Sequence, residues 1–89
     1  MTTLTLKNEP LAANVVFGDL SFRVALRDGR ELSVPIDWFP RLRRATPAQR
    51  QNWRLIGRGE GIHWPEIDED ISVLGLLAGF GDQTRVAAE

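Results

Sequence analysis

The sequence lacks several residue types on which common kinds of protein chemistry depend. Its 89 residues include no cysteine and one histidine. The absence of cysteine excludes disulfide bridges, thiolate nucleophiles and zinc sites built from thiolates. The single histidine, His63, excludes metal sites built from several imidazoles. We therefore expect packing alone to stabilise the fold, and we expect no cofactor.

Long hydrophobic runs are absent as well. The longest nearly apolar stretch extends from Val73 to Gly81, which is less than half of the roughly 20 residues that a membrane helix needs. The first ten residues, MTTLTLKNEP, lack the apolar core of a signal peptide. These features predict a cytoplasmic protein with no membrane association.

Neither sign of charge dominates. The chain has 11 basic and 12 acidic residues and a net charge of -1, which is too balanced to attract nucleic acid through the total field. Its contents of 43% hydrophobic and 26% charged residues are those of an ordinary globular protein. A chain of this length supports one hydrophobic core. We expect a single domain over residues 1–80 and a flexible tail over 81–89.

The first half of the chain has the pattern of a hairpin. Apolar and other residues alternate over 11–17 and again over 20–26, which is the period of half-buried strands. A two-residue turn at 18–19 would join the two runs and would pair Phe17 with Leu20. This register places every large apolar residue of the hairpin on one face.

A third strand continues the same alternation. The apolar positions of residues 32–36 keep the parity of the preceding strand. A three-residue turn over 27–29, with its glycine in the left-handed region, would pair Val24 with Leu32. Pro35 cannot donate a hydrogen bond to a neighbouring strand, so it marks the end of the third strand or an edge position. We predict a three-stranded antiparallel meander with one buried face.

Helix signals follow the meander. Thr46, Pro47 and Gln49 form a capping box with proline in the first turn. The helix that they begin is predicted to extend to about Ile56 and to end at Gly57.

A short fourth strand is then predicted over residues 62–64, where Pro65 stops it. The chain closes with a short helix capped by Asp70 or Ser72, in which Val73, Leu76, Leu77 and Phe80 recur at helical spacing. The predicted fold is α+β: a three-stranded antiparallel meander, a helix, a short fourth strand and a C-terminal helix packed on one sheet face.

Aromatic and apolar residues exceed what a small core needs. The chain has three tryptophans, and aromatic side chains concentrate at binding hot spots. Core packing is the better explanation for Trp53, whereas Trp38 and Trp64 are candidates for a recognition surface. The last helix is apolar on more than one side, and a domain of this size has little left to bury it. These features favour a protein partner or a homodimer.

Arginines offer a second hypothesis. Between Arg41 and Arg58 there are arginines but no acidic residue. Arg50 and Arg54 are four residues apart on the predicted helix, and Arg43 and Arg44 precede it. Such a stripe could bind the phosphates of nucleic acid. Neutralisation by the acidic segment 60–70, or solvation of a helix face, explains the same pattern without a ligand.

His63 and the acidic residues after it offer a third hypothesis. His63, Asp68 and Asp70 could hold a divalent cation in a small metal-dependent hydrolase. The simpler explanation is that carboxylates at a helix start cap its free amides. His63 lies out of phase with Ile62 and Trp64, so a half-exposed position with a hydrogen bond that fixes the loop is expected. On this interpretation the residues form neither a catalytic nor a metal site.

Two strings carry a family resemblance. The segments GIHWPEIDEDISVLGLL and VALRDGRELSVPIDWFPRLRRAT resemble the bacterial domain of unknown function 2442 family (DUF2442), over about residues 13–79. The residues that match its signature are Gly61, Ile62, His63, Trp64, Pro65, Asp68, Asp70 and Leu77, with Asp28, Gly29 and Pro40 as turn residues. The resemblance implies a small α+β fold. It also implies a second small protein encoded next to such a gene, in a suspected toxin–antitoxin pair.

The resemblance also implies that some relatives carry a helix-turn-helix module after this domain. The chain has 89 residues, so we do not expect it to read DNA through such a module. The favoured function is a non-enzymatic protein-interaction module that acts as an antitoxin-like or accessory partner of a second small protein. Its recognition surface is predicted to combine Trp38, Trp64, the acidic corner 68–70 and the last helix. The arginine-based regulator and the metal-dependent hydrolase remain the alternatives.

Overall fold

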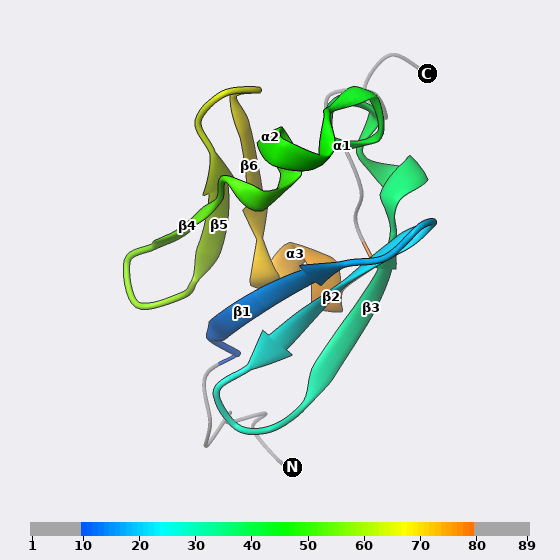
Figure 1. Cartoon of the computed structure of the whole chain (residues 1–89). Helices are drawn as coiled ribbons and strands as arrows, with labels where there is room; N and C mark the ends of the chain where they lie inside the picture. Colours follow the sequence, from blue (N-terminus) through cyan, green and yellow to red (C-terminus); the bar gives the residue numbers. More distant parts are fainter. Residues whose placement is uncertain (1–9, 80–89) are drawn as a thin grey trace, which may run out of the picture.

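The chain folds into two three-stranded antiparallel sheets connected by short helical segments (Figure 1). The computed structural model describes residues 10–79. In chain order its elements are β1 (Ala12–Phe17), β2 (Ser21–Leu26), β3 (Glu31–Pro35), the 3-10 helix η1 (Ile36–Trp38), α1 (Pro40–Arg44), α2 (Pro47–Gln51), β4 (Arg54–Ile56), β5 (Gly61–Trp64), β6 (Glu69–Ser72) and α3 (Val73–Leu77). The strand orders are β1-β2-β3 and β4-β5-β6. The predicted α+β class and the meander are confirmed.

The registers of the first sheet were predicted in part. The β2–β3 pairing sets Val24 opposite Leu32 as expected, and Gly29 has a positive φ of 98°. The β1–β2 pairing sets Phe17 opposite Phe22 instead of Leu20, so the turn is two residues longer than predicted. A shift of two residues keeps each side chain on its face. It nevertheless leaves Leu20 84% exposed in the turn, where a place in the core had been expected.

The predicted helix over 46–56 is wrong in its second half. Thr46 and Gln49 form the expected capping box, but α2 ends at Gln51. Residues 54–56 form strand β4, in which Leu55 pairs with Ile62 of β5. Pairing with a distant strand thus overrides the helical pattern of the local sequence.

A second sheet, and not helices alone, covers the buried face of the meander. One core cluster joins Phe22 and Val24 of the first sheet to Ile62 and Trp64 of the second sheet. The ring centroids of Phe22 and Trp64 are 6.4 Å apart in an edge-to-face arrangement, which is a favourable geometry for aromatic pairs. Leu42 of α1 is fully buried in the same cluster.

The two sheets are also joined through their backbones. The turn between β4 and β5 presses Gly59 against the start of β1, where the amide of Ala12 donates to the carbonyl oxygen of Gly59 at 2.8 Å. Gly59 has a φ of 117°. A Cβ atom at this position would lie 2.4 Å from the carbonyl oxygen of Ala12, so the contact requires glycine.

The C-terminal helix is short. Ser72 caps α3 by accepting a hydrogen bond from the amide of Gly75 at 3.1 Å. Asp70, the other predicted cap, lies within β6. The predicted continuation of the helix to Phe80 is wrong, because α3 ends at Leu77 and Gly79 has a positive φ of 88°. The predicted tail over 81–89 lies outside the described residues. No described helix is both long enough and apolar enough to cross a membrane.

An exposed clamp closes the β2–β3 turn. The Nε of Arg30 donates to the Asp28 carboxylate at 2.8 Å, and this hydrogen bond holds the pKa of Asp28 below its usual 3.8. Because the pKa of Asp28 is lower in the folded than in the unfolded state, its carboxylate stabilises the fold at pH values above the unfolded-state pKa. This stabilisation is lost as the pH falls through the folded-state pKa. In an NMR titration of the carboxyl carbons, we expect Arg30→Ala to raise the pKa of Asp28 toward 3.8.

Glu60 provides the control for this titration. Its pKa is lowered chiefly by the backbone amide of Arg58 in the other turn, and it should titrate identically in the Arg30→Ala protein. An unchanged pKa of Asp28 would show that Arg30 does not clamp the turn.

Candidate docking surface

The structure separates the two tryptophans predicted for a recognition surface. Trp38 in η1 remains 39% exposed. Trp64 is 0% exposed, and its Nε1 donates to the carbonyl oxygen of Arg50 at 2.9 Å. The predicted surface position of Trp64 is therefore corrected: its ring belongs to the face of β5 that turns toward the first sheet.

Three other predicted residues meet in one row on the outer face of the second sheet. Arg54 of β4 pairs with His63 of β5, and His63 pairs with Asp70 of β6. The Nδ1 of His63 contacts the Asp70 carboxylate, which agrees with the predicted hydrogen bond of His63. Asp68 lies apart in the β5–β6 turn, where its carbonyl oxygen accepts from Arg41 at 2.6 Å.

The metal-site hypothesis needs Asp68 together with His63 and Asp70. Within residues 10–79, no group of three such side chains is placed to hold a metal ion. The geometry of this row thus supports an ordered surface pair and supplies no metal centre.

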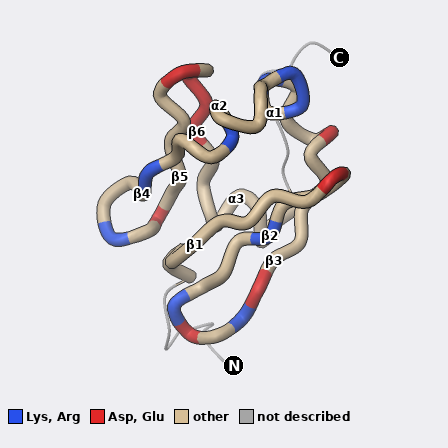
Figure 2. Tube along the Cα trace, in the orientation of Figure 1, with Lys and Arg blue, Asp and Glu red and all other residues tan. Residues whose placement is uncertain are grey.

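The predicted arginine stripe is not formed. Arg50 folds back, and its Nε and Nη2 donate to the carbonyl oxygens of Leu42 and Arg43 at 2.9 Å each. Its guanidinium also lies 5.9 Å from the centre of the Phe17 ring, within the range of a cation–π contact. Arg54 lies on a strand, so it shares no helix face with Arg50. Figure 2 shows the basic residues of segment 41–58 spread over α1, α2 and the β4–β5 hairpin, with further basic residues on β2 and the β2–β3 turn.

α3 carries the open apolar surface that the sequence predicted. Val73 and Leu76 are buried in the core, whereas Leu74 and Leu77 are 60% and 41% exposed. Leu74 and Leu77 are three residues apart, so they share one face of the helix. We call Leu74 and Leu77 the α3 face.

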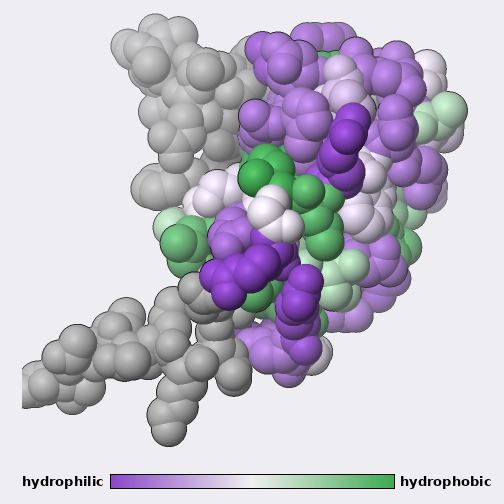
Figure 3. Space-filling model, turned by 90° about the vertical axis from the view of Figure 1, so that its left-hand side faces the viewer, coloured by the Kyte–Doolittle hydropathy of each residue, from purple (hydrophilic) through white to green (hydrophobic). Residues whose placement is uncertain are grey.

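Apolar surface is also visible on the side of the molecule where β4 lies. Figure 3 shows that side, with hydrophobic atoms gathered in the middle and hydrophilic atoms around them. Ile56 of β4 is 42% exposed. Its side chain packs against Gly61: a Cβ atom added to Gly61 would lie 3.1 Å from the Cδ1 of Ile56. Ile56 therefore covers the glycine backbone, and local packing explains its position without a partner.

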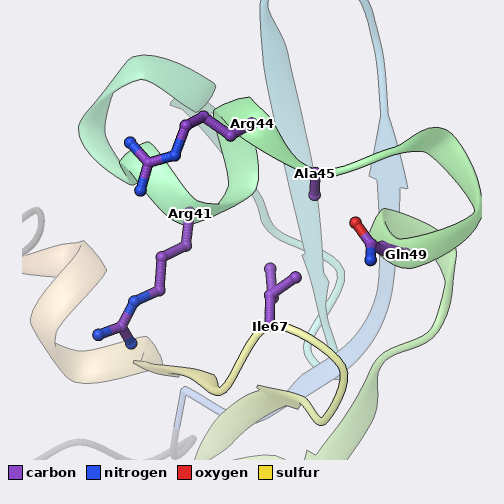
Figure 4. A pocket seen from close by; sticks show the side chains of 5 residues that line it. All are labelled: Arg41, Arg44, Ala45, Gln49 and Ile67. Atoms are coloured by element: carbon purple, nitrogen blue, oxygen red, sulfur yellow. The ribbon is translucent and has the colours of Figure 1, made fainter.

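A shallow hollow lies between the α1–α2 segment and the β5–β6 turn (Figure 4). It has a volume of roughly 200 Å³, and its lining residues are Arg41, Arg44, Ala45, Gln49 and Ile67. Small-molecule sites usually measure about 300 to 1,000 Å³. The hollow thus has room for one side chain but is small for a substrate.

The comparison with protein families decides the relationship of the chain. A family model described as a protein of unknown function, DUF2442, matches residues 12–82. The chain belongs to the DUF2442 family. The resemblance carried by the two sequence strings is thereby confirmed.

Two solved bacterial proteins share the DUF2442 fold of this chain. A crystal structure of a protein of unknown function from Rhodospirillum rubrum has a TM-score of 0.74 and 31% identity, with 84% of this chain and 93% of that chain covered. A solution structure of an uncharacterized protein from Chromobacterium violaceum has a TM-score of 0.70 and 26% identity, covering 81% and 68% of the respective chains. No curated protein matches.

Sequence reasoning missed the hollow of this DUF2442 chain. Arg41 and Arg44 are three residues apart, a spacing that sets both on one side of a helix. That signal was present in the sequence. Nothing in the sequence indicated that α1 meets the β5–β6 turn, which places Ile67 opposite the two arginines across the hollow.

Proposed function

We propose that this DUF2442 chain is a non-enzymatic, cytoplasmic protein-docking module. Its partner is a second small protein, and the chain acts as the antitoxin-like or accessory member of the pair. The observation that carries the proposal is the α3 face, where a helix made only of apolar residues buries one side and leaves the other open.

The size of the α3 face sets the energy available for docking. Leu74 and Leu77 together expose about one leucine side chain, and burying such a side chain contributes roughly 1.5 to 3 kcal/mol. That corresponds to about a tenfold to hundredfold change in the dissociation constant. The α3 face can therefore act as the hot spot of an interface but cannot form the whole of it.

A different protein fits this surface better than a second copy. In a two-fold dimer the same surface of both copies forms the interface, so the positive charge of Arg41 and Arg44 would face a surface that carries the same charge. Like charges placed together across an interface oppose association. A partner with apolar and acidic groups matches both the α3 face and the arginine-lined hollow.

Polar substitution of the α3 face tests the proposal. We expect Leu74→Gln with Leu77→Gln to weaken binding of the protein encoded beside this gene by tenfold to hundredfold in titration calorimetry. Glutamine keeps the length and the helix propensity of leucine, and circular dichroism should show an unchanged fold.

Leu20→Gln is the matched control, because Leu20 is even more exposed but lies in the β1–β2 turn. Its affinity should equal that of the wild type. Equal affinities of all three proteins would contradict docking through α3, and so would a loss confined to Leu20→Gln.

A further inference from the structure

The hollow at the β5–β6 turn combines cationic and apolar lining. From its geometry we infer that it receives a carboxylate from an acidic side chain of the docking partner. This inference rests on the proposed function, because it names the chemistry that the partner supplies.

The polar lining offers donors. Among the residues that the structure describes, none forms a hydrogen bond or ion pair with the side chain of Arg44. A guanidinium presents five N–H donors in a fork that matches a carboxylate. Arg41 is held in place by the carbonyl oxygen of Asp68 at 2.6 Å and by the Glu69 carboxylate at 3.8 Å. The Oε1 of Gln49 accepts from the amide of Thr46, so its NH₂ group remains a donor.

Both charged residues that line the hollow are arginines. Arg41 forms an ion pair with Glu69, and the adjacent β5–β6 turn also carries Glu66 and Asp68. Both arginines are exposed, and the guanidinium of Arg44 is the one without a hydrogen-bond or ion-pair partner within residues 10–79. An incoming carboxylate would pair with it through charge-assisted hydrogen bonds.

The apolar lining favours a side chain over a free anion. Ala45 and Ile67 face the middle of the hollow, and the two arginines extend along one side of it (Figure 4). Such walls match the methylene groups of a glutamate, which hydrated phosphate lacks. The volume of roughly 200 Å³ also limits the occupant to one side chain.

The hollow lies within reach of the α3 face. The four residues of β6 separate the β5–β6 turn from α3, and four strand residues span about 13 Å. A partner that covers roughly 800 Å² of surface, the usual share of one side of an interface, can reach both. The apolar and the acidic contact would then belong to one interface.

The carboxylate site can be tested without the partner. The probe is N-acetyl-glutamate α-amide, which has one side-chain carboxylate, added to the full chain while NMR shifts are followed. We expect saturable shifts at Ala45 and Ile67, none with N-acetyl-glutamine α-amide, and weaker binding of inorganic phosphate at equal ionic strength. Arg44→Gln should weaken the binding of the probe at least tenfold.

Arg54→Gln is the matched control, since Arg54 is an exposed arginine of the outer sheet face. It should leave the titration unchanged. The inference is overturned if the shifts do not saturate, if phosphate binds as well as the glutamate probe, or if both arginine variants lose binding equally.

Titration of the partner protein separates this inference from the proposed function. Arg44→Gln is expected to weaken the partner's binding about tenfold. If the α3 variant weakens binding and Arg44→Gln does not, docking stands and the carboxylate assignment fails. If the partner does not bind while the glutamate probe still occupies the hollow, the carboxylate site stands and the proposed function fails.

Discussion

Replacing Gly59 with alanine is expected to lower the melting temperature by at least about 12 °C. The φ of 117° is strained for any residue with a Cβ, at a cost of roughly 1 to 3 kcal/mol. The added Cβ would also lie 2.4 Å from the carbonyl oxygen of Ala12, so the backbones of β1 and the β4–β5 turn must separate. That movement breaks the hydrogen bond from Ala12 to Gly59, worth about 1 kcal/mol.

We expect a total loss of about 3 kcal/mol or more, and each kcal/mol shifts the melting temperature of a domain this size by roughly 4 to 8 °C. The whole stability of such a domain is only about 4 to 13 kcal/mol. Gly59→Ala should therefore remove at least about a quarter of the stability of the domain.

Gly29→Ala separates strain from collision. Gly29 also has a positive φ, of 98°, but a Cβ there would meet nothing within 4 Å. Its loss should be limited to the strain cost of roughly 1 to 3 kcal/mol. Equal losses for the two variants in thermal unfolding would show that the β4–β5 turn is not pressed against β1.

Substitution of Trp64 is expected to give the second large effect. Trp64→Ala removes a fully buried indole that meets Phe17 and Phe22 edge-on at centroid distances of 6.3 and 6.4 Å. Deleting a buried aromatic side chain costs roughly 3 to 5 kcal/mol. In urea unfolding we expect a loss of that size.

Two further variants resolve what the indole contributes. Trp64→Phe keeps a ring but leaves the carbonyl oxygen of Arg50 without its donor, at a cost of roughly 1 to 3 kcal/mol. Trp38→Phe changes an exposed side chain and should stay within about 0.5 kcal/mol of the wild type. If Trp64→Phe were as neutral as Trp38→Phe, Trp64 would be a surface residue, as the sequence had suggested.

The meander was readable from the sequence because two independent signals agree there. Strand parity and the glycine of the 27–29 turn select one β2–β3 register. The β1–β2 register was wrong because a turn two residues longer gives the same alternation of faces. Parity alone cannot distinguish such registers, and the exposed Leu20 is the residue that moves.

Strands β4 and β6, which the sequence did not predict, depend on contacts between segments that are distant in the chain. Gln49, Trp53 and Ile56 have helical spacing, yet β4 forms because Leu55 pairs with Ile62. The burial of Trp64 was signalled locally, since it shares the parity of Ile62 while His63 lies out of phase. The prediction for Trp64 was wrong because it followed the frequency of tryptophan at binding sites and not this parity.

The candidate site also has a part that the sequence predicted and a part that it did not. The apolar excess of the last helix was readable from composition and spacing, and the exposure of Leu74 agrees with it. Leu77 had been expected on the same face as Val73, yet Val73 is buried and Leu77 is exposed. The hollow was not readable, because it depends on Arg41 and Ile67 meeting across the fold. A basic sequence segment also cannot show that Arg50 is held by the carbonyl oxygens of α1.

Co-elution tests the docking proposal most directly. The chain is co-expressed with the protein encoded beside its gene, and the mixture is analysed by size-exclusion chromatography with light scattering. We predict one peak with the summed mass of both proteins, which resolves into two peaks when Leu74→Gln and Leu77→Gln are introduced. Two separate peaks for the wild-type pair, or an unchanged complex with the α3 variant, would contradict the proposal.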